Sequence, residues 1–309
     1  MKRALALFLK GAGMGAADAV PGVSGGTIAF VTGIYEELIH TIRQFGPDAF
    51  GAWRRGGLAG LAEHLNLRFL VPLVAGIALS LITVAHLVTY LLEAQPLLLD
   101  AFFFGLVAAS ALVVSRQVRG WRWWYILPLV IGLLLAQTLP DLMPKLAGLG
   151  DFLLVVSGAI AISAMLLPGV SGSFLLLAMG LYGTVMEGIK SFDLLLILQF
   201  GAGCAVGLFT FSRLLSWLFR HYHGPTLQLL IGFIVGSLPI LWPWRELISY
   251  RLGPDEQMIP LDYRYLLPHD YAQLTGDSAQ LVPALVLMIL GLVVVLAVGE
   301  RSTSSLKED

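Results

Sequence analysis

The sequence predicts an all-α integral membrane protein built from two inverted repeats, each a re-entrant broken-helix hairpin plus three transmembrane helices. Three observations predict this class. The 309-residue chain is 57% hydrophobic and only 13% charged, whereas soluble domains carry roughly 25% charged residues. Its apolar residues come in runs of about 20, the length that a helix needs to cross a bilayer. One short motif, Pro-Gly-Val-Ser-Gly, occurs twice.

Six apolar runs are long enough to be uninterrupted spans, and they cover 69–92, 97–115, 123–140, 194–219, 225–242 and 281–298. Two further apolar stretches, 4–42 and 151–189, are interrupted in the middle by the motif. The arm after each break holds about 16 residues, roughly 24 Å of helix, which is short for a crossing. Each of these stretches therefore predicts a hairpin that returns to the side from which it entered.

The Lys and Arg residues predict the orientation, because positively charged loops tend to stay in the cytoplasm. With both termini in the cytoplasm, thirteen of the 19 Lys and Arg lie inside, five lie outside, and Arg213 lies within a span. The loop 43–67 is then internal, and the acidic loop 243–280 is external. The aromatic residues near the predicted span ends are expected to be interfacial anchors; they are Trp121, Trp123, Trp124, Tyr125, Trp242 and Trp244.

The remaining composition excludes other classes. A net charge of −1 gives no reason to expect nucleic acid, and the single cysteine, Cys204, cannot form an internal disulfide. The sequence gives no sign of a cofactor or a metal site. It predicts one membrane domain, 1–309.

The two halves, 1–149 and 150–309, match position by position. An offset of 147 pairs the two motifs, and it also pairs Gly33 with Gly180 and Tyr35 with Tyr182. Each half has one hairpin and three spans, an odd number of crossings, so the halves must have opposite orientations. Inverted repeats with broken helices are typical of transporters, whose substrate lies near the midplane where the breaks approach each other.

The motif chemistry favours an anion. Each break frees backbone N–H groups, which are costly at membrane depth unless they face protein, water or a ligand. The following helix directs its N-terminal amides and positive dipole end at the same point, where Ser24, Thr27, Ser171 and Ser173 can add hydroxyl groups. This combination suits a phosphate or a carboxylate. The alternative is that the glycines only permit close helix packing, but two copies in the same order favour a shared binding role.

Charged residues within the spans are further candidates. Arg213 and, at an offset of 127, His86 occupy equivalent places in the two halves, which predicts a second contact to an anionic head group; interhelical hydrogen bonding is the alternative. Asp18 and Glu36 lie close to the first motif. These two residues, and also Glu37 and Glu187 on the arms after the breaks, can carry protons or bind a coupling ion, either proton or sodium, or they can face water.

Two stretches carry a family resemblance: Gly15-Ala16-Ala17-Asp18 through Pro21-Gly22-Val23-Ser24-Gly25-Gly26-Thr27 to Gly33-Ile34-Tyr35-Glu36, and Pro168-Gly169-Val170-Ser171-Gly172-Ser173-Phe174 to Gly180-Leu181-Tyr182. They resemble the PopT-type undecaprenyl-phosphate translocase family of prokaryotic polytopic membrane proteins, and the resemblance covers nearly the whole chain. It implies a flippase, not an enzyme, that returns undecaprenyl phosphate from the outer to the inner leaflet of the cytoplasmic membrane for cell-envelope synthesis. The implied partners are the polyprenyl phosphate lipid and the phospholipid bilayer.

The candidate substrate-binding residues combine three sources. The resemblance implies phosphate contacts for the motif residues Ser24, Gly25, Gly26, Thr27, Ser171, Gly172 and Ser173, with Asp18, Tyr35, Glu36 and Tyr182 nearby. The turn residues Pro21, Gly22, Pro168 and Gly169 complete the two motifs. His86 and Arg213 follow from the repeat alone.

Two other functions remain open at this stage. Gly22-Val23-Ser24-Gly25 and Gly169-Val170-Ser171-Gly172 match the nucleophile pattern of rhomboid-like intramembrane serine proteases, although such an enzyme needs a base beside one serine. A small-anion transporter or channel would use the same amide-lined breaks, because the motif does not reveal whether a lipid tail is attached to the anion.

Overall fold

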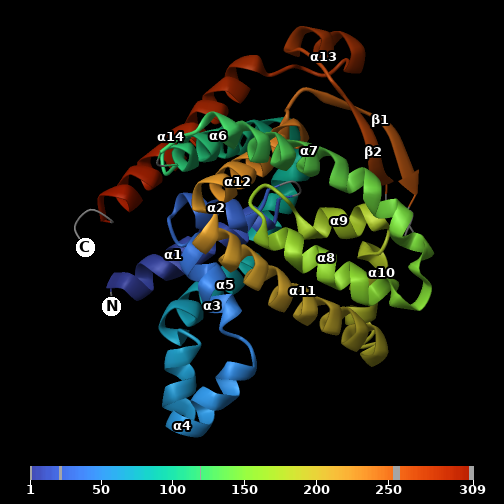
Figure 1. Cartoon of the computed structure of the whole chain (residues 1–309). Helices are drawn as coiled ribbons and strands as arrows, with labels where there is room; N and C mark the ends of the chain where they lie inside the picture. Colours follow the sequence, from blue (N-terminus) through green and yellow to red (C-terminus); the bar gives the residue numbers. More distant parts are fainter. Residues whose placement is uncertain (1, 21–22, 119, 253–257, 306–309) are drawn as a thin grey trace.

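The computed structural model describes residues 2–20, 23–118, 120–252 and 258–305, and this part of the chain is mostly helical (Figure 1). Its long apolar helices agree closely with the six predicted spans. They are α5 (Leu67–Ala94), α6 (Pro96–Ser115), α7 (Ile126–Leu142) between η1 (Trp123–Tyr125) and η2 (Met143–Phe152), α11 (Leu194–His221), α12 (His223–Ser237) followed by η3 (Leu238–Leu241), and α14 (Leu281–Ser305). The chain is therefore an all-α multi-pass membrane protein.

The two broken stretches each form three helices rather than two. The first contains α1 (Lys2–Asp18), α2 (Gly25–Val31) and α3 (Tyr35–Arg43), and the second contains α8 (Leu153–Leu166), α9 (Gly172–Met179) and α10 (Tyr182–Lys190). The prediction of one continuous arm after each break was wrong. Gly33 (φ 71°) and Gly180 (φ 76°) adopt left-handed backbone angles that end α2 and α9, and side chains disfavour these angles.

The second bend makes the arms too short to cross a bilayer. α9 and α10 meet at 104°, and helices of the length of α2 or α9 extend only about 10–12 Å. This geometry is compatible with the predicted re-entrant hairpins.

The helix packing follows the same pattern in both halves. α1 packs along α5 and α8 along α11, whereas α6 packs along α14 and α7 along α12, so the last span of each half packs against the other half. Each of these four interfaces has a glycine beside a backbone carbonyl of the facing helix: Gly76 beside Phe8, Gly203 beside Val155, Gly105 beside Met288 and Gly232 beside Leu129. Small residues at such crossings allow close backbone approach. The inverted orientation of the halves stays a prediction.

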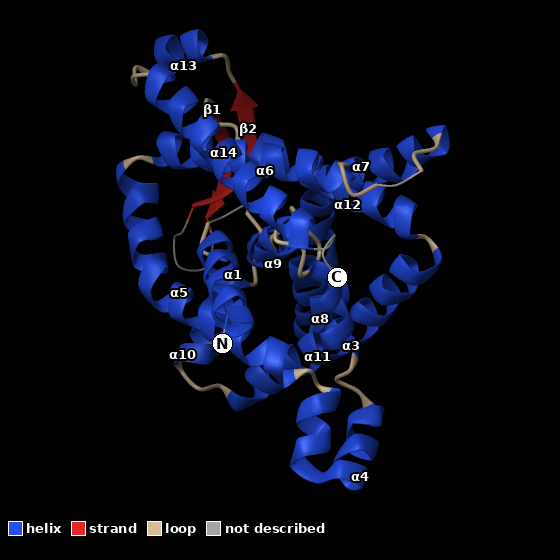
Figure 2. Ribbon diagram, turned by 90° about the vertical axis from the view of Figure 1, so that its left-hand side faces the viewer, coloured by secondary structure: helices blue, strands red, loops and turns tan. Residues whose placement is uncertain are grey.

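Two insertions project from opposite ends of the molecule (Figures 1 and 2). The loop 43–67 contains α4 (Pro47–His64), which bends at Gly57 and has no buried residue. The loop 243–280 contains the antiparallel strands β1 (Arg245–Leu252) and β2 (Met258–Tyr265), with Arg245 opposite Tyr265, and the helix α13 (Pro268–Thr275). The sequence did not predict this β-hairpin.

Trp244 corrects the prediction that it is an interfacial anchor. Its side chain is 2% exposed, packs with Leu97, Ala101 and Ala284, and donates from Nε1 to the Ala279 carbonyl at 2.8 Å. A buried indole with a satisfied N–H holds the insertion 243–280 against the spans instead of contacting lipid. Trp123, by contrast, is highly exposed.

Candidate anion-binding site at the two broken helices

The two breaks contact each other directly through three hydrogen bonds. The Thr27 hydroxyl accepts from the Gly169 N–H at 2.9 Å. The hydroxyls of Ser24 and Tyr35 donate to the carbonyls of Leu167 and Leu166, at 3.3 Å and 2.5 Å. Side chains of the first break therefore satisfy backbone groups of the second. The two breaks meet, as is expected in a transporter with broken helices.

The first break is closed. The Gly25 N–H donates to Asp18 Oδ1 at 2.6 Å, and the Gly26 N–H donates to Ser24 Oγ at 3.2 Å. Ser24 and Thr27 are buried. A carboxylate of the protein thus occupies the amides at the start of α2, where an external anion would otherwise bind.

The second break is more open. Ser171 Oγ accepts from the Phe174 N–H at 3.3 Å and lies 2.9 Å from Ser173 Oγ. The N–H groups of Gly172 and Ser173 have no hydrogen-bond partner within the described part of the chain. Ser173 is exposed and Ser171 half-buried. Two free amides, two hydroxyls and the positive end of α9 therefore converge, an arrangement suited to binding an anion.

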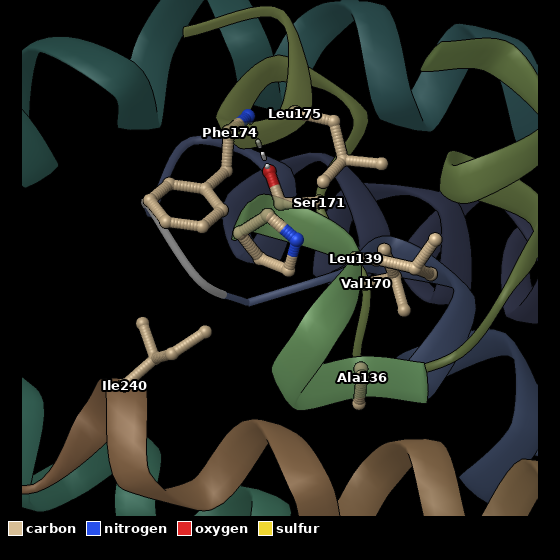
Figure 3. A pocket seen from close by; sticks show the side chains of 9 residues that line it. Ala136, Leu139, Val170, Ser171, Phe174, Leu175 and Ile240 are labelled. Atoms are coloured by element: carbon tan, nitrogen blue, oxygen red, sulfur yellow. Dashed lines mark hydrogen bonds between the residues drawn. The ribbon is translucent and has the colours of Figure 1, made fainter. Parts of the chain in front are cut away.

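A small pocket adjoins the second break (Figure 3). Its volume of about 10 Å³ holds about one water molecule. The lining comes from α7, from the second break, from α9 and from η3: Ala136, Leu139, Pro140, Gly169, Val170, Ser171, Phe174, Leu175 and Ile240. A phosphate group is larger than this volume, so it does not fit into the pocket as the structure shows it.

The motif glycines also have a packing role. A side chain on Gly172 would overlap the Ala161 carbonyl of α8, and one on Gly169 would come within 2.7 Å of the Phe233 carbonyl of α12. Pro168, directly before Gly169, is buried. The alternative interpretation, that the glycines permit close helix packing, therefore holds at both positions. It holds together with the free amides at the start of α9.

Several predicted site residues do not contact the breaks. Arg213 donates to the Phe209 carbonyl at 3.2 Å, stacks on the Phe209 ring and lies beside Gly46. The full length of α3 separates Gly46 from Tyr35, so Arg213 lies away from the contact between the breaks.

Glu36 and Tyr182 likewise make no hydrogen bond to the opposite break within the described residues. Glu36 pairs with His223 at 3.0 Å, and both side chains are exposed. Tyr182 is half-buried against the main apolar core. Pro21 and Gly22 lie outside the described residues, as does the side chain of His86.

A buried ion pair behind the pocket was not among the predicted site residues. Arg245 Nη2 lies 2.8 Å from Asp100 Oδ2, and the two side chains are 19% and 9% exposed. Arg245 also donates to the carbonyl of Ile240, which lines the pocket. The signal in the sequence was Asp100, an acidic residue inside the apolar run 97–115, because ionisable residues within spans usually have a role.

Comparison with known proteins gives three results. Residues 14–258 match the model of the undecaprenyl phosphate translocase-like family. A polyprenyl-phosphate transporter of Vibrio cholerae is 43% identical over 292 residues, 94% of this chain and 95% of that protein. A polyprenyl-phosphate transporter of Staphylococcus aureus is 34% identical over 254 residues, 76% of this chain and 85% of that protein. No solved structure matches the chain.

Proposed function

Because this chain belongs to the undecaprenyl phosphate translocase-like family, we propose that it is a polyprenyl-phosphate translocase that binds the lipid phosphate at the second break. The observation that carries the proposal is the pair of free amides at Gly172 and Ser173 beside the hydroxyls of Ser171 and Ser173. These groups form a donor set for a phosphate monoester at the start of α9.

The physical task is to move one charged group. The isoprenoid tail can stay in hydrocarbon throughout, so the barrier is the desolvation of the phosphate. Donors at the second break replace part of its hydration. The first break offers an equivalent set once the Asp18 carboxylate leaves the Gly25 N–H.

The direction and the location are part of the proposal. We place both termini and α4 in the cytoplasm and the β-hairpin outside, since the Lys and Arg residues are concentrated in the loops of the first side. The lipid then returns from the outer to the inner leaflet of the cytoplasmic membrane, for reuse in cell-envelope synthesis. A coupling proton or sodium ion stays a prediction, and the carboxylates predicted for it are Asp18, Glu36, Glu37 and Glu187.

The serine contacts support transport over proteolysis. Ser24 donates to a backbone carbonyl, and Ser171 contacts Ser173 and the Phe174 N–H. In the described part of the chain neither serine has a His, Asp or Glu hydrogen-bond partner. A serine nucleophile requires such a base, so we propose no enzymatic activity.

The test reconstitutes the purified protein in liposomes with undecaprenyl phosphate and measures how fast outer-leaflet phosphate becomes inaccessible. We expect the wild type to accelerate this step and the Ser171→Ala/Ser173→Ala variant to lose about tenfold or more, because a hydrogen bond to a charged group contributes about 1.5–3 kcal/mol. The control is Ser191→Ala, whose hydroxyl donates to the Glu187 and Gly188 carbonyls at the end of α10. If the wild type accelerates nothing under any imposed ion gradient, the lipid must be abandoned in favour of a small anion.

A further inference from the structure

Arg245 lies directly behind the wall of the second-break pocket. It is the first residue of β1, and its guanidinium donates both to Asp100 in α6 and to the Ile240 carbonyl in η3. The Ile240 side chain lines the pocket together with Ser171 and Phe174 (Figure 3). β2 of the same hairpin packs against α9. Ile240 thus links the guanidinium to the pocket that Ser171 also lines.

The guanidinium of Arg245 also packs on an aromatic ring. Its guanidinium carbon lies 4.7 Å from the centre of the Tyr263 ring, within the range of a cation–π contact. Burial raises the pKa of the Tyr263 phenol, so the ring stays neutral. Asp100 supplies the charge that balances the guanidinium.

The ion pair with Asp100 is difficult to explain as a device for stability. A buried pair of this kind contributes little net stability compared with apolar residues of similar volume, because both ions must be desolvated. Its best-attested uses are in specificity and switching. A carboxylate presents two oxygens to an arginine fork in the same way that a phosphate does.

The small pocket links the ion pair to the second break. Its volume holds about one water molecule, and Ile240 forms part of its wall. The Ile240 carbonyl is bonded to Arg245, whose guanidinium is also bonded to Asp100, so the ion pair is linked to this part of the pocket wall.

We propose that Arg245 is a phosphate-binding residue at the entrance to the second break, and that the phosphate monoester of an incoming lipid replaces Asp100 as the partner of its guanidinium. The exchange releases Ile240 and opens the pocket toward Ser171. Asp100 is then a positioning residue that keeps Arg245 ready and competes with the ligand. This inference rests on the proposed function.

The experiment measures the binding of farnesyl phosphate, a soluble phosphate monoester with a short prenyl chain, to the full chain in nanodiscs. We expect Arg245→Gln to weaken binding at least tenfold. Asp100→Asn should tighten binding several-fold, because the competing carboxylate is gone. Farnesol, which lacks the phosphate, should not show these differences in affinity between the variants. Inorganic phosphate should show the same order of affinities if the head group alone is recognised.

Two controls separate binding from mere support of the fold. The double exchange Asp100→Arg/Arg245→Asp keeps an ion pair but moves the cation, so it should melt like the wild type and still bind poorly. Arg264→Gln removes another arginine of the same hairpin, one that is exposed and pairs with Glu246 at 3.7 Å, and it should leave affinity unchanged. Cys204 is the only cysteine, so a thiol-reactive dye reports whether each variant is folded.

The opposite outcomes are clear. The inference would be overturned if Asp100→Asn and Arg245→Gln weakened binding equally, or if the double exchange fully restored binding. The ion pair would then serve only to hold the fold together. If Arg245→Gln does not fold, the sign of the Asp100→Asn effect decides. Normal binding by Arg245→Gln in a protein that still translocates lipid removes this inference alone, whereas a wild type inactive in liposomes removes the proposed function.

Discussion

The two breaks have nearly the same sequence but different structures. In the first break, Asp18 and Ser24 accept hydrogen bonds from the amides of Gly25 and Gly26. In the second, the amides of Gly172 and Ser173 have no partner in the described chain, and the site borders a pocket. The shared motif therefore supplies the donors, and its neighbours decide whether those donors are occupied.

Substitutions at equivalent positions explain the difference. At the offset of 147, Asp18 corresponds to Met165, so the second half has no carboxylate to place on its own amides. Thr27 corresponds to Phe174, so at this position the first half has a hydroxyl that accepts from the opposite backbone and the second half has none. The first break acts as the brace and the second as the receptor in this state of the molecule.

The largest expected effect comes from filling the space at Gly172. Gly172→Ala places a methyl group against the Ala161 carbonyl, and such overpacking costs about 3 kcal/mol. Gly26→Ala in the first break meets Ser24 Oγ at 3.1 Å, and better helix propensity offsets about 1 kcal/mol of that contact. Thermal unfolding followed by dye labelling of Cys204 should show a much lower melting temperature only for the first variant. Equal melting temperatures would contradict the packing role of Gly172.

The brace between the breaks is the next test. Thr27→Val removes the acceptor of the Gly169 N–H while keeping the side-chain shape, and an unpaired buried N–H costs about 1–3 kcal/mol. The same unfolding assay should report this loss. Thr83→Val is the matched control, because its exposed hydroxyl bonds only to its own helix. A Thr27→Val variant as stable as the control would show that the breaks are held together by other contacts.

The smallest effect compares the paired tyrosines. Tyr35→Phe loses the hydrogen bond to the Leu166 carbonyl, at a cost of about 0.5–1.5 kcal/mol. Tyr182→Phe should change stability hardly at all, since the Tyr182 hydroxyl has no hydrogen bond within the described residues. The asymmetry of the breaks therefore predicts a lower melting temperature for Tyr35→Phe than for Tyr182→Phe, and the reverse order would refute it.

The parts of the fold that depend on the composition of long segments could be predicted from the sequence. The six spans follow from length and hydropathy, and they agree closely with the helices of the structure. The second bend at Gly33 and Gly180 was missed because an apolar run looks continuous, although the paired glycines were visible in the repeat. The β-hairpin of 245–265 was missed because its residues were read only as a charged external loop.

The motifs of the candidate site could be predicted from the sequence, but the contacts around them could not. The motif predicts Ser171, Gly172 and Ser173 as binding residues, and this stays a prediction, whereas pairing charges by offset alone selected Arg213, which contacts Gly46 and not the breaks. The arginine near the pocket, Arg245, comes from an insertion without an equivalent in the first half. An internal repeat can predict only those contacts that both halves share.

The packing of the last span of each half against the other half has a consequence for biosynthesis. Because α6 packs along α14, the glycine face of α6 at Gly105 lacks its partner until the ribosome has made nearly the whole chain. Half-made protein must hold that face against lipid or against other membrane proteins in the meantime. Release of a nascent chain before α14 is inserted would leave the first half without the helix that completes it, a state that membrane quality control can recognise.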